Sequence, residues 1–228
     1  MPPLPLPAAV AAVAVAFRGA AVHSDETGCG RCFGDATLRI LRSPGAPLPP
    51  DDVARISGKD PTHWEDRPAV MRRILPRLVA LLAEGTDDPD RLARGLAAAG
   101  WQQWPAPESR AVARFLDAWW AAALAEDTPP TPAADVLAAC TIARASATPF
   151  LARWATDTSM TARAHLARSA PRWWEDFDLG HSPFDWWWGS DTARDAADAE
   201  LREFLTVHAP RAGTARSGRP GGPPIVAS

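Results

Sequence analysis

The stretch APESRAVARFLDAWWAAALA, residues 106–125, decides the fold class. Pro107 and Glu108 suit the first turn of a helix, where a missing N–H costs nothing and a carboxylate meets the positive end of the helix dipole. Large apolar residues then recur at spacings of three and four, at Val112, Phe115, Leu116, Trp119, Trp120 and Leu124. This period places them on one face of an α-helix. The segment therefore predicts a long amphipathic helix packed against a core.

Similar helical patterns extend on both sides of this segment. Further helices are expected over 67–84, 88–99 and 135–145, from Thr148, from 158 or 159 to 169, and from 191 or 192 through Leu205. Pro76 predicts a kink or break in the first of these, because proline removes a hydrogen bond and clashes with the preceding turn. No stretch alternates polar and apolar residues as a strand does. The sequence predicts an all-α fold of eight to ten short helices packed as antiparallel hairpins, in a compact bundle or short irregular solenoid.

The predicted domain organisation has three parts. Residues 1–7 contain four prolines and are expected to be disordered, residues 8–208 to form a single helical domain, and residues 209–228 to form a disordered tail rich in Pro, Gly and Arg. The apolar run 8–17 resembles the core of a signal peptide, but no Lys or Arg precedes it. We therefore interpret this run as a buried first helix and expect a cytoplasmic protein.

Composition argues against several classes of function. The 228 residues carry a net charge of −3, so no general basic field exists to hold a nucleic acid. No apolar run is long enough to span a membrane. The motifs HExxH, GxGxxG and the phosphate-binding loop are missing, which favours a non-enzymatic role. Acidic pairs such as Glu65-Asp66, Asp87-Asp88 and Glu175-Asp176 are expected at helix starts or in loops, and most of them are interpreted as helix caps.

The motif Cys29-Gly30-Arg31-Cys32 is the most compact chemical pattern. Two thiols at this spacing can hold one metal ion or close a redox disulfide, or they can simply pack a turn. A structural zinc ion needs four ligands, and His23 and His63 are the candidates for the other two. This spacing matches no common zinc finger. The predicted metal site is therefore Cys29, Cys32, His23 and His63, with zinc as the candidate ion and no other cofactor expected.

A tryptophan-rich segment is the second unusual feature. It contains Trp173, Trp174, Trp186, Trp187 and Trp188. Successive helical residues point about 100° apart, so three consecutive indoles cannot all face inward. Because Trp is enriched at interface hot spots, these five residues are predicted to form a binding surface for another protein. A loop packed back over the core is the alternative interpretation.

Several short stretches together resemble an uncharacterised family of bacterial cytoplasmic helical proteins. The resemblance covers roughly residues 15–207 and rests on the N-terminal CxxC, the helix containing Leu75-Pro76-Arg77, His165-Leu166 before the Trp-rich segment, and the closing helix over Leu201 to Leu205. The glutamate that follows the Leu-Pro-Arg helix core in that family is replaced by Ala80 or a neighbour here. The resemblance implies a compact helical fold and no particular substrate.

Two functions are compatible with these observations. The first is a helical interaction or scaffold protein that binds another protein, whose identity the sequence does not indicate. The second is a zinc-binding or thiol-redox protein that uses Cys29 and Cys32. The sequence favours the first, because its helical pattern is clear while a single CxxC is a weak metal motif.

Overall fold

The computed structural model describes residues 4–184 and 190–210. Within these ranges the chain forms ten α-helices and two short 3₁₀ helices, and no described residue lies in a strand. The first six elements are α1 (Leu6–Ala16), α2 (Asp35–Arg42), α3 (Pro50–Ser57), η1 (Pro61–His63), α4 (Arg67–Ala83) and α5 (Pro89–Ala99). The others are η2 (Trp101–Gln103), α6 (Ala106–Ala125), α7 (Ala133–Arg144), α8 (Thr148–Thr156), α9 (Met160–Asp178) and α10 (Asp191–His208). The predicted all-α class is confirmed.

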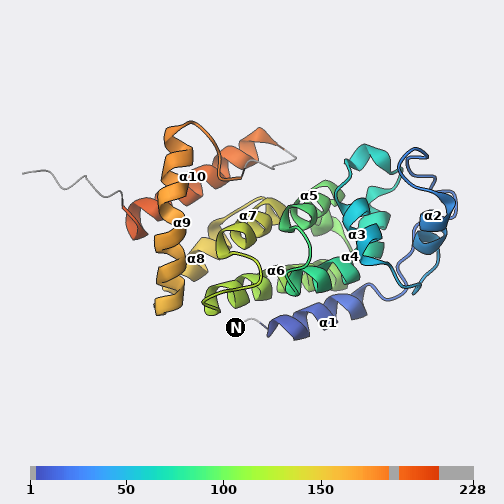
Figure 1. Ribbon diagram of the computed structural model, residues 1–228, viewed down its shortest axis with the longest axis horizontal. Coiled ribbons are helices and arrows are strands. Elements are labelled where there is room, and N and C mark those ends of the chain that lie inside the picture. The colour runs from blue at the N-terminus through green and yellow to red at the C-terminus, as the bar shows by residue number, and fades with distance from the viewer. Residues whose placement is uncertain (1–3, 185–189, 211–228) are drawn as a thin grey trace, which may run out of the picture.

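The centre of the fold is a layer of packed helices. Helix α1 packs along α4 and α6, and α5 packs against both α4 and α7. Figure 1 shows α2 and α3 at one end of this layer, and α9 and α10 at the other. The predicted helix at 106–125 is α6, and its apolar face is buried, with Phe115 and Trp120 among the largest side chains fully removed from solvent. No described helix is long and apolar enough to cross a membrane.

Of the predicted kink or break at Pro76, the break is wrong, because α4 is continuous through this residue. The helix runs from Arg67 to Ala83 with Pro76 inside it. Pro76 cannot donate to the carbonyl four residues earlier. Leu75, Leu78 and Val79 are all buried beside it, so packing on both sides of the proline compensates for the lost hydrogen bond and keeps the helix continuous.

Two helix boundaries also differ from the prediction. Helix α1 begins at Leu6, with Pro7 in its first turn, so residues 6 and 7 belong to the helix rather than to an irregular N-terminus. Proline is well tolerated there because the first-turn N–H groups have no partner inside the helix. Helix α9 continues past Ser169 and Pro171 to Asp178. Trp173 and Phe177 are buried on this extension, and their packing explains why it is helical. Residues 1–3 and 211–228 of the predicted termini lie outside the described residues.

Candidate metal centre

The cysteine pair lies in the loop between α1 and α2. The carbonyl of Cys29 accepts the N–H groups of Cys32 at 2.8 Å and of Phe33 at 3.0 Å, which closes a tight turn. The Arg55 guanidinium donates to the carbonyl of Cys32 at 3.2 Å. The Phe33 ring lies 4.3 Å from that of Trp64, centroid to centroid. The turn is thus anchored to α3 and to the segment that follows η1.

His63 lies at the end of η1, in the loop between α3 and α4. Asp60 begins this short helix, because its carboxylate accepts the N–H of Thr62 at 2.9 Å and its carbonyl accepts the N–H of His63 at 3.1 Å. Hydrogen bonds from the Thr62 hydroxyl and N–H lower the pKa of Asp60. A charged Asp60 therefore keeps the histidine on an ordered turn.

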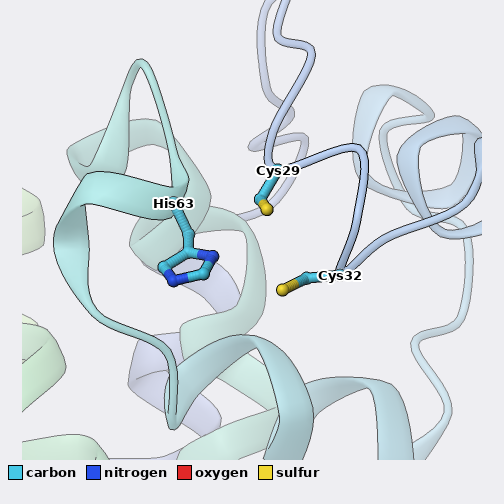
Figure 2. Close-up of side chains that lie close together, drawn as sticks. All are labelled: Cys29, Cys32 and His63. Carbon is cyan, nitrogen blue, oxygen red and sulfur yellow. The ribbon is translucent and has the colours of Figure 1, made fainter.

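The two loops bring three ligand-type side chains together. The ligand atoms of Cys29, Cys32 and His63 all lie within 4.8 Å of one another, and the three residues are half-buried. Figure 2 shows both sulfur atoms and one ring nitrogen turned toward a common point. Ligands about 2.3 Å from a tetrahedral ion are about 3.8 Å apart, so small side-chain rotations would complete the site. The Nδ1 atom of His63 is buried and has no hydrogen-bond partner among the described residues.

The local environment favours the thiolate form of Cys29. Its pKa is lowered to about 7, chiefly by the backbone N–H of Arg31, with further contributions from the Cys32 side chain and N–H and from His63. Partial burial opposes this shift but does not outweigh it. The thiolate is the form that binds metal ions and reacts as a nucleophile.

Glu26 joins the two loops, and no motif in the sequence marks it. Its side chain is 2% exposed, and its carboxylate accepts N–H groups from Gly28 at 2.9 Å, Glu65 at 3.2 Å and Asp66 at 2.8 Å. The first of these lies in the cysteine loop and the other two follow His63. A buried carboxylate with three backbone donors therefore fixes the cysteines relative to the histidine.

Gly28 allows the close approach of the two loops. Its φ angle is +56°, and a Cβ atom added there would lie 2.8 Å from Cζ3 of Trp64. Only glycine adopts this conformation without strain and also leaves space for the indole. Contact with the segment that carries His63 therefore requires a glycine directly before Cys29.

His23 is not part of this group. It is exposed and makes a hydrogen bond with Asp25. Of the four residues predicted from the sequence as ligands, the structure thus brings together Cys29, Cys32 and His63 and leaves His23 apart. Distance along the chain could not distinguish His23 from His63, because the fold rather than the spacing decides which one meets the thiols.

The predicted tryptophan surface divides into three groups. Trp173 is 6% exposed and its ring packs edge-on against Trp154 at 5.9 Å, so this member of the predicted binding surface lies in the core. Trp174 is half-buried and its indole N–H donates to the carbonyl of Ala209 at 3.0 Å. Trp186, Trp187 and Trp188 lie outside the described residues. The helical extension of α9 turns Trp173 inward, because neighbouring helical residues point in different directions.

Trp174 lines a groove of about 530 Å³ beside the C-terminal half of α9. Ala170, Pro171 and Leu179 contribute apolar surface, and Glu175 lies among the lining residues. Leu179 is 63% exposed. The groove is thus an apolar surface with an acidic neighbour.

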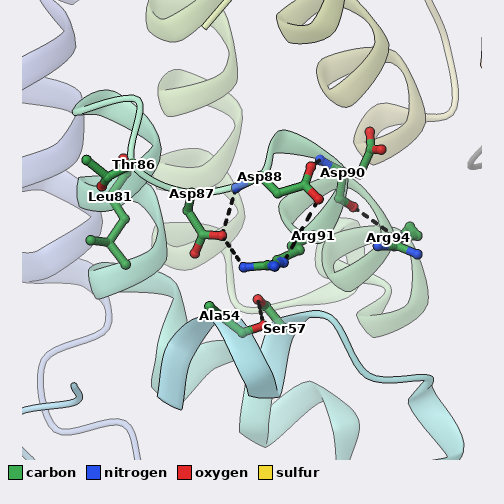
Figure 3. Close-up of polar contacts among 9 residues, drawn as sticks. All are labelled: Ala54, Ser57, Leu81, Thr86, Asp87, Asp88, Asp90, Arg91 and Arg94. Carbon is green, nitrogen blue, oxygen red and sulfur yellow. Dashed lines mark hydrogen bonds and ion pairs between the residues drawn. The ribbon is translucent and has the colours of Figure 1, made fainter. Parts of the chain in front are cut away.

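Asp66 and Asp88 serve as helix caps, as expected, whereas Glu175 and Asp176 lie inside α9, so their predicted place at a helix start or in a loop is wrong. Asp66 accepts the N–H of Ala69 at 2.9 Å at the start of α4. At the start of α5, Asp88 accepts the N–H of Asp90 at 3.0 Å, while Asp87 pairs with Arg91 at 2.7 Å (Figure 3). The carboxylates of Asp66 and Asp88 thus satisfy N–H groups that the first turn of a helix leaves without partners.

Comparison of the chain with protein-family models, with curated proteins and with solved structures finds no match. The resemblance to a bacterial family stays a prediction. A function can therefore be inferred only from the arrangement of the side chains, above all Cys29, Cys32 and His63.

Proposed function

We propose that this protein binds a transition-metal ion, with zinc as the best fit, through Cys29, Cys32 and His63. The observation that carries the proposal is the convergence of the three ligand atoms within 4.8 Å, from two loops that are distant in sequence. Thiolate and imidazole are the ligands that zinc prefers in proteins. The free Nδ1 atom of His63 adds support, because a buried ring nitrogen without a partner gains one when a metal binds.

The proposed site has three protein ligands and one open position. The group in the described part of the chain comprises two cysteines and one histidine. Tetrahedral zinc with three protein ligands completes its coordination with water or an external molecule. The half-buried position of all three ligands is compatible with such access.

Glu26 and the three backbone N–H groups that it accepts form what we call the Glu26 clamp. This clamp supports metal binding because it keeps the ligand-bearing loops in place before a metal ion binds. Its hydrogen bonds connect the cysteine loop to the histidine loop without any contribution from a metal ion. Groups that orient ligands typically change metal affinity by about 10–100-fold when they are removed. The proposal therefore includes Glu26 as a positioning residue.

Zinc titration against a chromophoric chelator tests the proposal. We expect one zinc ion per chain in the wild type, and loss of tight binding in Cys32→Ser and His63→Ala. His23→Ala is the matched control, because it removes a histidine that the structure leaves outside the group. Circular dichroism of each metal-free variant verifies that it is folded. A wild type without zinc affinity, or a Cys32→Ser variant that binds equally well, would overturn the proposal.

A second candidate function is the binding of a basic, apolar peptide segment of a partner protein in the groove beside α9. The apolar lining from Pro171 and Leu179, together with the carboxylate of Glu175, favours a ligand of this chemistry. We expect a short peptide of alternating arginine and leucine to bind, and binding to weaken in Leu179→Glu. A glutamate-leucine peptide is the control. Equal affinity for the two peptides would exclude this function.

A further inference from the structure

The geometry of the cysteine pair fits a disulfide as well as a metal ion. The two residues are joined by the turn in which Cys32 donates its N–H to the carbonyl of Cys29 at 2.8 Å. Their sulfur atoms belong to the group whose members all lie within 4.8 Å. A disulfide needs a sulfur–sulfur distance of about 2.05 Å, with Cβ atoms about 3.5–4.5 Å apart. The short turn keeps the two residues adjacent, so closing the bond requires mainly side-chain rotation.

Cys29 and Cys32 differ from the third cysteine, Cys140, in how far solvent can reach them. Cys29 and Cys32 are half-buried, whereas Cys140 is completely buried on α7 and its thiol faces the carbonyl of Leu116 at 3.7 Å. An oxidant in solution can reach the first two thiols and not the third. Cys29 and Cys32 are therefore each other's available partners within one chain.

The two loops remain connected when no metal is present. Glu26 bridges them through backbone N–H groups, and Thr27 donates its hydroxyl to Glu65 at 3.0 Å. The neighbouring rings of Phe33 and Trp64, tilted by 32° from each other, add an apolar contact. None of these contacts uses a sulfur atom, so the loops can keep their arrangement while the thiols change their chemical state.

We propose that a peroxide oxidises Cys29 and Cys32 to a disulfide and thereby releases the bound metal ion, so that the site acts as a reversible redox switch. This inference rests on the proposed metal-binding function. One thiolate attacks an oxygen atom of hydrogen peroxide, the O–O bond breaks, and a sulfenic acid and a hydroxide ion form. The second thiolate attacks the sulfenic sulfur and displaces a second hydroxide ion, which closes the disulfide.

This two-step oxidation is balanced in electrons and atoms. The two sulfur atoms lose two electrons in total and the peroxide gains them, while zinc remains Zn²⁺. Two protons from solvent convert the two hydroxide ions to water. The ion then retains His63 as its sole protein ligand from this group, which is too few for tight binding.

Treatment of the zinc-loaded protein with hydrogen peroxide tests the switch. A colorimetric zinc indicator measures metal release, and mass spectrometry measures the bond formed. We expect one zinc ion released for each disulfide, with a mass lower by about 2 Da than that of the reduced metal-free chain because two hydrogens are lost. Peptide mapping should connect Cys29 to Cys32, and dithiothreitol should restore zinc binding. Cys32→Ser in its metal-free form is the control, since it cannot form this disulfide.

The outcomes distinguish the switch from the metal site itself. If the untreated protein binds no zinc, the proposed function fails and the switch fails with it. If zinc binds and peroxide leaves it in place, the metal site stands and the switch is wrong. Release accompanied by sulfinic acid, without recovery in dithiothreitol, would also overturn the switch, because it describes irreversible damage.

Discussion

The cysteine–histidine loops and the tryptophan-rich end of the molecule are both unusual in sequence, yet they have opposite structural roles. The loops place three reactive side chains together at a half-exposed point. At the other end, Trp173 packs against Trp154, which in turn contacts Trp120 and Phe204. Rare residues therefore do not identify a functional site by themselves. Convergence of compatible chemical groups from distant segments is the more useful sign.

The largest expected effect is a loss of stability at the tryptophan-rich end of the molecule. Trp173→Ala should lower the free energy of unfolding by about 3–5 kcal/mol, because it leaves a cavity beside Trp154. Trp174→Ala is the matched comparison and should cost clearly less, since Trp174 is only half-buried. Urea denaturation of both variants measures the difference. Equal losses of unfolding free energy would contradict the difference in burial between Trp173 and Trp174.

The next largest effect is a loss of stability and zinc affinity when the Glu26 clamp is altered. Glu26→Gln replaces an acceptor oxygen with an N–H₂ group facing backbone donors, and should destabilise the protein by about 1–3 kcal/mol. Zinc affinity should fall by roughly 10–100-fold, because the ligands lose their orientation. Glu65→Gln provides the control, as it removes a nearby exposed charge and can still accept from Thr27. Competition titration and thermal melts would contradict the account if the two variants behaved alike.

A smaller effect is expected at the glycine beside Cys29. Gly28→Ala should cost about 1–2 kcal/mol for the positive φ angle, with an added penalty from the contact with Trp64. Gly30→Ala has open space around its Cβ position and should change stability by less than about 0.5 kcal/mol. Thermal unfolding of the two variants measures this contrast within one turn. A neutral Gly28→Ala would mean that the loops do not approach as the structure indicates.

The smallest effect is a difference in thiol reactivity with pH. In the metal-free protein, alkylation of Cys29 by iodoacetamide should accelerate through a midpoint near pH 7, because its pKa is about 7 and the thiolate reacts. Below this midpoint the thiol is protonated and slow, and well above it the rate reaches a plateau. Cys140 should stay unmodified, since burial raises its pKa and excludes the reagent. Peptide mapping over a pH series separates the two sites.

Much of the fold could be predicted from the sequence, because helical periodicity is a local property. The apolar spacing of 106–125 and the capping residue Asp88 were sufficient to locate α6 and the start of α5. The continuity of α4 through Pro76 and of α9 through Pro171 could not be predicted in this way. Tertiary packing decides whether a proline breaks a helix, and the sequence pattern alone does not contain that packing.

The site was predictable only in part, for a similar reason. The CxxC spacing marks Cys29 and Cys32 as a pair, but the choice between His23 and His63 depends on how two loops meet. Glu26 has no motif, and its role exists only because three N–H groups from two segments surround it. Long-range contacts of this kind leave no periodic signal.

X-ray absorption spectroscopy at the zinc edge tests the central claim most directly. The account predicts two sulfur ligands at about 2.3 Å, one imidazole nitrogen at about 2.0–2.1 Å, and one further light-atom ligand around the ion. His63→Ala binds zinc more weakly, but at the high protein concentration of this measurement it should still hold the ion through both sulfurs and lack the imidazole scattering. A wild-type spectrum with only nitrogen and oxygen neighbours would contradict the claim that Cys29, Cys32 and His63 hold the metal.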